Sequence, residues 1–471
     1  MQQTTVENGS RARDLGQIVR AELAGLRSYF DRGTTRSLGW RLGQLDAIEK
    51  FLIEREEDIC EALRQDLGKP KIEAFAAEVA LCKQEIVHVR KHLRSWMRPE
   101  RVRSSKATFP GKSYVYREPL GVALIIGPWN YPMQLLIAPL IGAVSAGNCA
   151  MVKPSEVSPA TSAMLARWLP KYLDTDAVKV MEGGVEETTA LLNEKWDHIF
   201  YTGNGHVGRI VMSAAAKHLT PVTLELGGKS PCIVDRSANI DVTARRIVFG
   251  KFYNAGQTCV APDYVLVDET VHDALINAMV AHVREFFGDD PEKSPDFGRI
   301  INERHYARLM KLIDGANVAT GGTGDEAARY IAPTILRDVK DSDPVMRDEI
   351  FGPVLPVISV TGVDEAIHRV NERDKPLALY VFSEDVNVQD RVIAQTSAGG
   401  TTVNHIWLHL SVPDLPFGGV GESGMGGYHG RDSFETFSHR RSVLRMPTWL
   451  DPSLLYPPYT ELKQKIIRKL I

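Results

Sequence analysis

The residue with the clearest chemical potential is Cys259, which ends the segment Asn254-Ala255-Gly256-Gln257-Thr258-Cys259. We expect Gly256 to terminate a helix over residues 241–253, which leaves Cys259 on a loop just beyond a helix C-terminus. The helix dipole does not favour a thiolate there, so a nucleophilic Cys259 needs a nearby base or a bound positive charge. An isolated cysteine is also a common core residue, and its type alone favours packing over catalysis.

Two turns have the composition of nucleotide-binding turns. Residues 203–208, Gly-Asn-Gly-His-Val-Gly, match G-x-G-x-x-G between a predicted strand and a predicted helix, and Glu225 lies 17 residues beyond the last glycine. Taken alone, this pattern places Glu225 on a ribose hydroxyl. Lys153-Pro154-Ser155-Glu156 follows another predicted strand, where a lysine and a glutamate could bind ribose hydroxyls. Each segment is equally compatible with an ordinary structural turn.

Considered together, these residues form an ordered set of five motifs. The motifs, in chain order, are Gly127-Pro128-Trp129-Asn130-Tyr131-Pro132, Lys153-Pro154-Ser155-Glu156, Glu225-Leu226-Gly227-Gly228-Lys229, Gly256-Gln257-Thr258-Cys259 and Glu349-Ile350-Phe351-Gly352-Pro353. They resemble the motif set of the aldehyde dehydrogenase superfamily over residues 16–455. Residues 416–430 further resemble its class 3 branch, which acts on fatty and aromatic aldehydes.

The resemblance implies a reaction and a set of catalytic residues. Cys259 would attack the aldehyde carbon to form a thiohemiacetal, whose oxyanion would be bound by the Asn130 side-chain amide and the Cys259 N–H. Hydride would then leave for the nicotinamide, and a thioester would remain. Glu225 would act as the general base that activates water for hydrolysis, and so would not be the ribose ligand suggested by the glycine pattern.

The resemblance also implies a cofactor site. Lys153 and Glu156 would bind the adenosine ribose, and Glu349 and Phe351 would hold the nicotinamide half. The remaining predicted cofactor contacts are Trp129, Gly203, Val207, Gly208, Leu226 and Gly227. Glu156 would repel a 2′-phosphate, which favours NAD, with NADP as the alternative. Asn204-Gly205-His206 departs from the Ser-Thr-Glu that the superfamily often has after this turn, which predicts a looser turn or altered phosphate contacts.

The residues predicted to line the aldehyde pocket are chosen by their positions relative to these motifs. They are Tyr131, Leu135, Thr258, Ile406, Trp407 and His409. Their mostly apolar character suits medium-chain, long-chain or aromatic aldehydes, although each could equally be an ordinary core residue. His429 is interpreted as a structural histidine near the entrance.

Composition and charge exclude several classes of protein. The chain has 471 residues, with 44% hydrophobic and 24% charged side chains and a net charge of -3, which suggests two or three domains and gives no sign of a nucleic-acid partner. Its five cysteines are widely spaced and include no C-x-x-C pair, so we expect neither a disulfide framework nor a metal site. This cysteine usage favours a reducing, cytoplasmic location.

Three segments bear on membrane contact. Residues 119–152 carry no charge, but Pro132, Pro139 and Gly142 interrupt them, so we expect a buried strand, a turn and a buried helix rather than a membrane span. Residues 1–16 lack the apolar core of a signal peptide, and no long apolar tail follows Leu455. Residues 461–471 form a basic amphipathic helix, expected to pack on the body, with peripheral membrane contact as the alternative.

The apolar pattern predicts an α/β fold. Residues 16–98 show helical spacing. Strands are then predicted at 112–117, 120–126, 149–152, 178–181, 198–202, 222–226, 232–234 and 264–267, and helices at 159–169 (ended by Pro170), 187–192, 207–218, 241–253 and 271–287. This order predicts a Rossmann-like cofactor domain (1–102 and 119–228) and an α/β catalytic domain (229–430), with a small β bridging or oligomerisation element (103–118 and 431–450) and a C-terminal tail (451–471). By the resemblance, the 103–116 hairpin and residues 434–443 would bridge a homodimer.

Three other functions fit parts of this pattern. A cofactor-independent thiol esterase or hydrolase could use Cys259 and Glu225, but it leaves Lys153, Glu349 and Phe351 without a role. A CoA-acylating dehydrogenase has no need of a general-base glutamate. A non-enzymatic binding protein gives no reason for a matched nucleophile and base.

Overall fold

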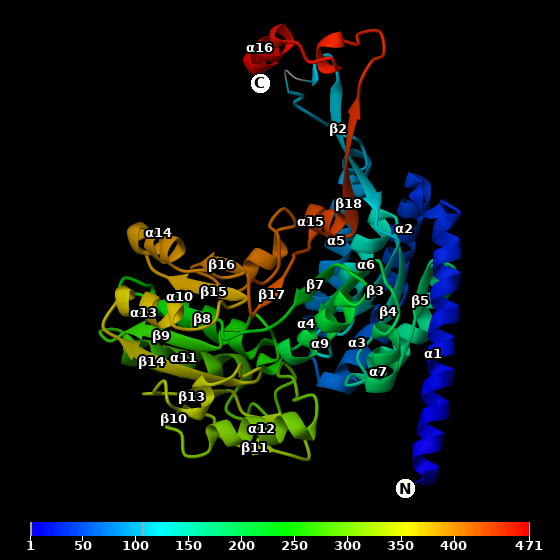
Figure 1. Cartoon of the computed structure of the whole chain (residues 1–471). Helices are drawn as coiled ribbons and strands as arrows, with labels where there is room; N and C mark the ends of the chain where they lie inside the picture. The colour runs from blue at the N-terminus through cyan, green and yellow to red at the C-terminus, as the bar shows by residue number, and fades with distance from the viewer. Residues whose placement is uncertain (1, 106–107, 471) are drawn as a thin grey trace.

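The computed structural model describes residues 2–105 and 108–470, which form two α/β lobes and a projecting arm (Figure 1). The first lobe contains a six-stranded sheet of order β17-β7-β6-β3-β4-β5. Its strands are β3 (Val122–Ile126), β4 (Cys149–Lys153), β5 (Val178–Val180), β6 (His198–Thr202), β7 (Val222–Glu225) and β17 (Gly424–Met425). All pair in parallel except β17, which joins β7 antiparallel through Gly424 and Glu225.

Helices surround this first sheet. Four of them connect its strands: α6 (Gln134–Ala146), α7 (Pro159–Tyr172), α8 (Val185–Leu192) and α9 (Gly205–Ala216). The N-terminal part adds α1 (Gln2–Asp31), α2 (Leu38–Glu54), α3 (Glu56–Leu67), α4 (Lys71–Ala74), the π-helix η2 (Phe75–Ala80) and α5 (Leu81–Trp96). Every residue of β3 and of α6 is buried, which places the uncharged stretch inside the lobe. Among the described residues, no helix is long and apolar enough to cross a bilayer.

The second lobe is built on a seven-stranded sheet of order β10-β13-β14-β9-β8-β15-β16. Its strands are β8 (Pro231–Val234), β9 (Tyr264–Asp268), β10 (Val318–Thr320), β13 (Thr334–Leu336), β14 (Val354–Val360), β15 (Ala378–Phe382) and β16 (Gly400–Val403). The helices are α10 (Ile240–Phe252), α11 (His272–Phe287), α12 (Glu303–Ile313), α13 (Val363–Asn371) and α14 (Val386–Gln395), and β11 (Gly324–Asp325) pairs with β12 (Tyr330–Ile331). The predicted α/β class is therefore confirmed.

The arm consists of a three-stranded antiparallel sheet and the C-terminal helix. Strands β1 (Glu100–Val102) and β18 (Ser438–Arg445) flank β2 (Lys112–Pro119), and β18 continues from α15 (Gly430–Thr436) at the base of the arm. Helix α16 (Glu461–Leu470) lies at the far end of the arm (Figure 1).

Several element bounds differ from the predictions, and three of the differences concern the elements around the site. Helix α7 runs through Pro170 to Tyr172 and does not end at Leu169. Proline costs the helix only the one hydrogen bond that its missing N–H would make, and Leu173 N–H still donates to Leu169 O at 3.0 Å. Helix α9 begins at Gly205, because the Asn204 side chain caps it by accepting from Val207 N–H at 3.0 Å. Strand β17 (Gly424–Met425) lies within residues 229–430, which were predicted to form the catalytic domain, but it pairs with β7 in the sheet of the first lobe.

Candidate active site

The loop that carries Cys259 is held by an unusual backbone. After α10, a 3₁₀ turn (Tyr253–Gly256) places Asn254 (φ 53) and Ala255 (φ 51) in the left-handed region. Gly256 also has a positive φ, and a Cβ there would lie 2.2 Å from Gly352 O. Only glycine fits this approach, and it brings the Cys259 loop directly against the segment that contains Glu349 and Phe351.

Asn130 is joined to the Cys259 loop by hydrogen bonds. It lies between β3 and α6 and is 3% exposed. Its side-chain Nδ2 donates to Gln257 O at 3.0 Å, and its own carbonyl accepts from Asn254 Nδ2 at 3.0 Å. The structure therefore fixes the Asn130 amide two residues from Cys259 along the loop, although the two lie far apart in sequence.

Glu225 ends β7 and is 2% exposed. Neither of its carboxyl oxygens has a hydrogen-bond partner among the described residues. Burial raises the pKa of this carboxyl well above its ordinary value of 4.5. Burial therefore favours the neutral carboxyl over the carboxylate relative to an exposed glutamate, and the carboxylate is the stronger base for it.

The Cys259 thiol is also held in its neutral form. Burial raises the pKa of this thiol to about 12, and the Glu349 and Glu225 carboxylates raise it further, while the N–H groups of Cys259 and Val260 oppose the shift. The sequence suggested that either a nearby base or a bound positive charge would help to deprotonate Cys259. When ionised, the neighbouring carboxylates instead disfavour the thiolate by charge repulsion. A positive charge brought near the thiol would favour it.

The predicted adenosine contacts gather at the carboxyl ends of the first sheet. Lys153 ends β4, is 2% exposed and pairs through Nζ with Glu156 Oε2 at 2.6 Å, while the Glu156 side chain is 45% exposed. A Cβ on Gly203 would lie 2.2 Å from Tyr201 Oη. Gly208 on α9 approaches Leu226, where a Cβ would be 2.9 Å from Cδ2. Asn204 closes the intervening turn by capping Val207 N–H.

A second group lies around Glu349. Burial raises the pKa of Glu349 to about 8, Asp263 adds to the shift, and the Gly228 N–H opposes it. Gly227 makes room for this carboxyl, since a Cβ there would lie 2.1 Å from Glu349 Oε2. Phe351 meets the Trp129 ring edge-on at 5.2 Å between centroids.

Sequence reasoning missed His305 in this second group. Its ring packs on Trp129 at 5.0 Å, and burial lowers its pKa to about 4. His305 belongs to none of the motifs, and only the packing of α12 against the Trp129 loop reveals it.

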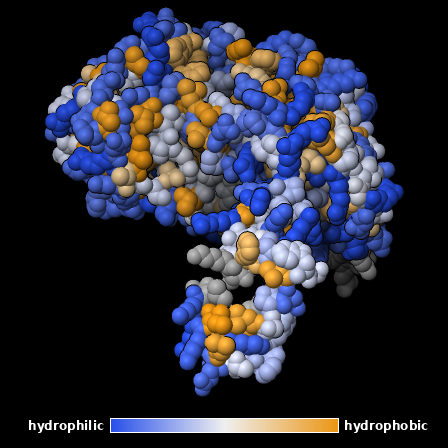
Figure 2. Space-filling view, turned by 90° about the horizontal axis from the view of Figure 1, so that it is seen from above, coloured by the Kyte–Doolittle hydropathy of each residue, from blue (hydrophilic) through white to orange (hydrophobic). Residues whose placement is uncertain are grey.

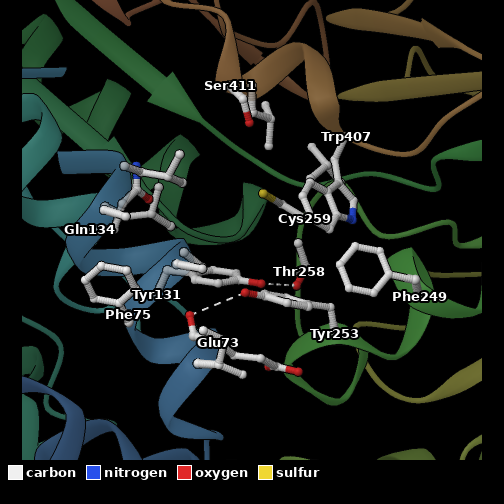
Figure 3. Close-up of a pocket in the computed structure, with 18 of the residues that line it drawn as sticks. Glu73, Phe75, Tyr131, Gln134, Phe249, Tyr253, Thr258, Cys259, Trp407 and Ser411 are labelled. Atoms are coloured by element: carbon white, nitrogen blue, oxygen red, sulfur yellow. Dashed lines mark hydrogen bonds between the residues drawn. The ribbon is translucent and has the colours of Figure 1, made fainter. Parts of the chain in front are cut away.

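A cavity of about 830 Å³ has Cys259 among its lining residues (Figure 3). Of the six predicted pocket residues, Tyr131, Leu135, Thr258 and Trp407 line it, and the Tyr131 and Thr258 hydroxyls hydrogen-bond at 2.8 Å. The sequence did not indicate most of the wall, which includes Glu73, Phe75, Phe249, Tyr253, Phe286, Phe287, Leu410, Phe417 and Tyr428. These residues come from elements far apart in the chain, so no local pattern unites them.

Two predicted pocket residues do not line the cavity. Ile406 is fully buried and packs on α10, where a Cβ on Gly250 would lie 2.3 Å from Ile406 Cγ2. His409 instead pairs through Nδ1 with Thr402 Oγ1 at 2.7 Å. His429 does line the cavity and stacks on Phe417 at 5.3 Å, and burial lowers its pKa to about 4. No group of three or more histidine, cysteine or acidic residues in the described part of the chain could hold a metal ion.

The structure combines two α/β lobes with a mostly apolar cavity whose lining includes Cys259. The model of the aldehyde dehydrogenase family matches residues 19–443, and the chain belongs to this family. It is an aldehyde dehydrogenase, and its reaction is the NAD(P)-dependent oxidation of aldehydes to carboxylic acids. The resemblance inferred from the five motifs is thereby confirmed.

Individual relatives match over nearly their whole length. The chain is 51% identical over 434 residues to "Aldehyde dehydrogenase, dimeric NADP-preferring" of Canis lupus familiaris, covering 92% of this chain and 96% of the relative. It is 49% identical over 444 residues to "Aldehyde dehydrogenase family 3 member A2" of Pongo abelii, covering 94% and 92%. The solved structure "Substrate bound state of Staphylococcus Aureus AldH" superposes with a TM-score of 0.94 at 46% identity, covering 96% of this chain and 99% of that one.

Proposed function

We propose that this enzyme oxidises medium-chain, long-chain or aromatic aldehydes, with Cys259 as nucleophile, Asn130 as oxyanion donor and Glu225 as general base. The observation that carries the proposal is the cavity of about 830 Å³ that Cys259 lines. Aromatic and aliphatic side chains make up most of its wall (Figure 3). Burial of a long apolar tail there is favourable by roughly 0.8 kcal/mol per methylene.

In the first half of the reaction, Cys259 Sγ adds to the aldehyde carbon and forms a thiohemiacetal. Asn130 Nδ2 carries two hydrogens, and one of them is engaged by Gln257 O. The other is free to donate to the carbonyl oxygen together with the Cys259 N–H. Loss of one such donor typically costs about 10²–10³ in rate.

The residues around Glu349 and Lys153 fit a nicotinamide dinucleotide. Lys153 is buried and Glu349 half-buried at the edge of the glycine-lined turns, where glycines leave space that a Cβ would fill. When bound, the cofactor supplies the hydride acceptor. Glu349 and Phe351 would hold its nicotinamide half, with Trp129 beside them, and Lys153 and Glu156 its adenosine ribose. The exposed Glu156 carboxylate favours NAD, while the NADP preference in the name of the canine relative supports NADP as a second cofactor.

In the second half, Glu225 accepts a proton from the water that hydrolyses the Cys259 thioester. Its raised pKa makes the ionised carboxylate a strong base, and neither oxygen has a hydrogen-bond partner among the residues that the structure describes. Since Cys259, Asn130 and Glu225 could also form and hydrolyse an acyl-enzyme from an ester, we expect cofactor-independent esterase turnover as a side activity.

We further propose a division of labour among the three parts of the fold. The lobe around β3–β7 binds the cofactor, and the lobe around β8–β16 completes the aldehyde pocket. The arm bridges a homodimer in the cytoplasm. Trp449, 76% exposed, lies beyond β18 among other exposed apolar side chains, and Figure 2 shows an apolar patch on the projecting part. The basic helix α16 supports peripheral contact with an anionic membrane. Light scattering and vesicle co-sedimentation test these two assignments.

The central test is a kinetic screen of purified enzyme with NAD and NADP against aldehydes of graded chain length. Cys259→Ala should abolish NADH formation, and Glu225→Gln should slow thioester hydrolysis more than hydride transfer. Cys60→Ala, which removes a cysteine outside the cavity lining, is the matched control and should retain activity. Undiminished NADH formation by Cys259→Ala would rule out the proposal.

A further inference from the structure

Three charged side chains behind the catalytic loops have no role in the proposed reaction. Lys69, Glu73 and Glu78 lie on one short stretch that includes α4 and the π-helix η2. They are 1%, 8% and 0% exposed, respectively. Burial of charge is costly unless every group is paired, and a buried ion pair is weak evidence for stability by itself. π-helical turns are also rare and occur often at functional sites.

The Lys69–Glu78 pair holds both ends of the Asn130 loop. Lys69 Nζ donates to Glu78 Oε1 at 2.5 Å and to Asn130 O at 3.1 Å. The other oxygen of Glu78 accepts from Met133 N–H at 2.9 Å and from Gln134 N–H at 3.2 Å, where α6 begins. One ion pair therefore binds the backbone on either side of the loop. The Lys69 ammonium also lies 4.2 Å from the centre of the Tyr131 ring.

Glu73 makes the corresponding contact with the Cys259 loop. Its Oε2 accepts from the N–H of Asn254, at 3.0 Å, where the backbone is left-handed. Asn254 in turn donates through Nδ2 to Asn130 O at 3.0 Å and to Gln257 O at 3.1 Å. Glu73 lines the cavity close to Tyr131 and Tyr253, as Figure 3 shows. Burial raises the pKa of its carboxyl to about 7.

These hydrogen bonds converge on the two backbone loops that carry Asn130 and Cys259. We propose that Lys69, Glu73 and Glu78 are positioning residues that lock the Asn130 loop to the Cys259 loop and so aim the Asn130 amide at the oxyanion. The inference rests on the proposed role of Asn130. Displacement of a reacting group by about 1 Å can cost about 10² in rate, so release of this clamp should slow catalysis strongly.

The test separates reactions that form an oxyanion from one that does not. The variant Lys69→Met/Glu78→Gln removes the ion pair without leaving a lone buried charge. We expect aldehyde oxidation and ester hydrolysis to fall at least tenfold in kcat. Alkylation of Cys259 by iodoacetamide should stay within about twofold, because displacement at that carbon needs no oxyanion donor. Lys71→Met, which breaks the exposed pair of Lys71 with Glu57, is the matched control and should behave as wild type.

Asn130→Ala provides the benchmark. If the clamp acts through Asn130, the addition of Lys69→Met/Glu78→Gln to Asn130→Ala should cause little further loss of kcat. A full additional tenfold loss, or a parallel loss of alkylation, would mean a general structural role and overturn the inference. If Asn130→Ala itself leaves both oxyanion reactions unchanged, the proposed role of Asn130 fails instead.

Glu73 gives an independent arm should the double variant fail to fold. Glu73→Gln keeps a side-chain oxygen that can accept from Asn254 N–H, and we expect it to retain kcat within about threefold. Glu73→Met removes the acceptor and should lose at least tenfold in kcat with alkylation preserved. Equal kcat in Glu73→Gln and Glu73→Met would contradict the proposal.

Discussion

The pKa of Cys259 leads to a quantitative prediction about its reactivity. Burial raises this pKa from 9.0 to about 12, a shift that lowers the thiolate fraction near neutral pH about 10³-fold. A more basic thiolate is intrinsically more nucleophilic, and with a Brønsted slope of about 0.4–0.5 this returns a factor of about 16–32. Cofactor-free Cys259 should therefore react about 30–60-fold more slowly than an ordinary exposed thiol.

The dependence on pH follows from the same shift. Because only the thiolate reacts, and because pH 7–9 lies below the raised pKa, the alkylation rate should rise about tenfold per pH unit across this range. NAD⁺ at saturating concentration brings the positive charge of its nicotinamide ring into the site, which lowers the pKa of Cys259. Alkylation at pH 7.5 should therefore accelerate at least tenfold. The flanking Glu349 and Glu225 carboxylates have the opposite effect, because they raise this pKa.

The assay is the second-order rate of iodoacetamide labelling, with the modified peptide identified by mass spectrometry. Identification by peptide is needed because four further cysteines, all buried, are present. A cofactor-free rate equal to that of an exposed thiol, or a rate that begins to level off near pH 9, would refute the argument. An acceleration by NAD⁺ in Glu225→Gln as large as in wild type would show that the positive charge acts without Glu225.

Three further predictions test the pocket, the cofactor site and the fold. Trp407 packs against Phe249 and Tyr253 on the cavity wall, so Trp407→Ala should raise KM for a long-chain aldehyde about tenfold and leave KM for acetaldehyde nearly unchanged; equal effects on both would contradict an apolar-tail site. Gly227→Ala would drive a Cβ into Glu349 Oε2 and should weaken NAD binding at least tenfold in a fluorescence titration, whereas unchanged affinity would remove Glu349 from the cofactor site. Burial raises the pKa of Glu85 from 4.5 to about 7 in the folded protein. As pH rises from 4.5 to 7, this carboxyl ionises in the unfolded chain but stays protonated in the folded one, so the free energy of unfolding falls across that window. Glu85→Gln should abolish a loss of about 3 kcal/mol between pH 4.5 and 8 in urea unfolding, and an unchanged pH profile would show that the Glu85 pKa is ordinary.

The sequence alone determined the family and most of the secondary structure. Glycines and alternating apolar runs are local signals, since a left-handed turn needs glycine and a strand buried on both faces needs a continuous apolar run. The strand at 198–202 was predicted with its observed bounds, and the five ordered motifs together identified the family and its reaction. Helix α7 shows the limit of such signals, because hydrogen bonds beyond Pro170 outweigh the local preference of proline to end a helix.

Only the tertiary structure decided the surroundings of the catalytic residues. Tyr131 and Trp407 were expected in the pocket from their places near motifs and do line it, whereas Ile406 packs under α10 instead. Glu73 and Lys69 carry no motif, yet Lys69 donates to Asn130 O and Glu73 accepts from Asn254 N–H, on loops that lie 124 residues apart in sequence. The tertiary structure also decides the protonation of Cys259. Burial and neighbouring carboxylates set its pKa, and these come from segments that the chain brings together only when it folds.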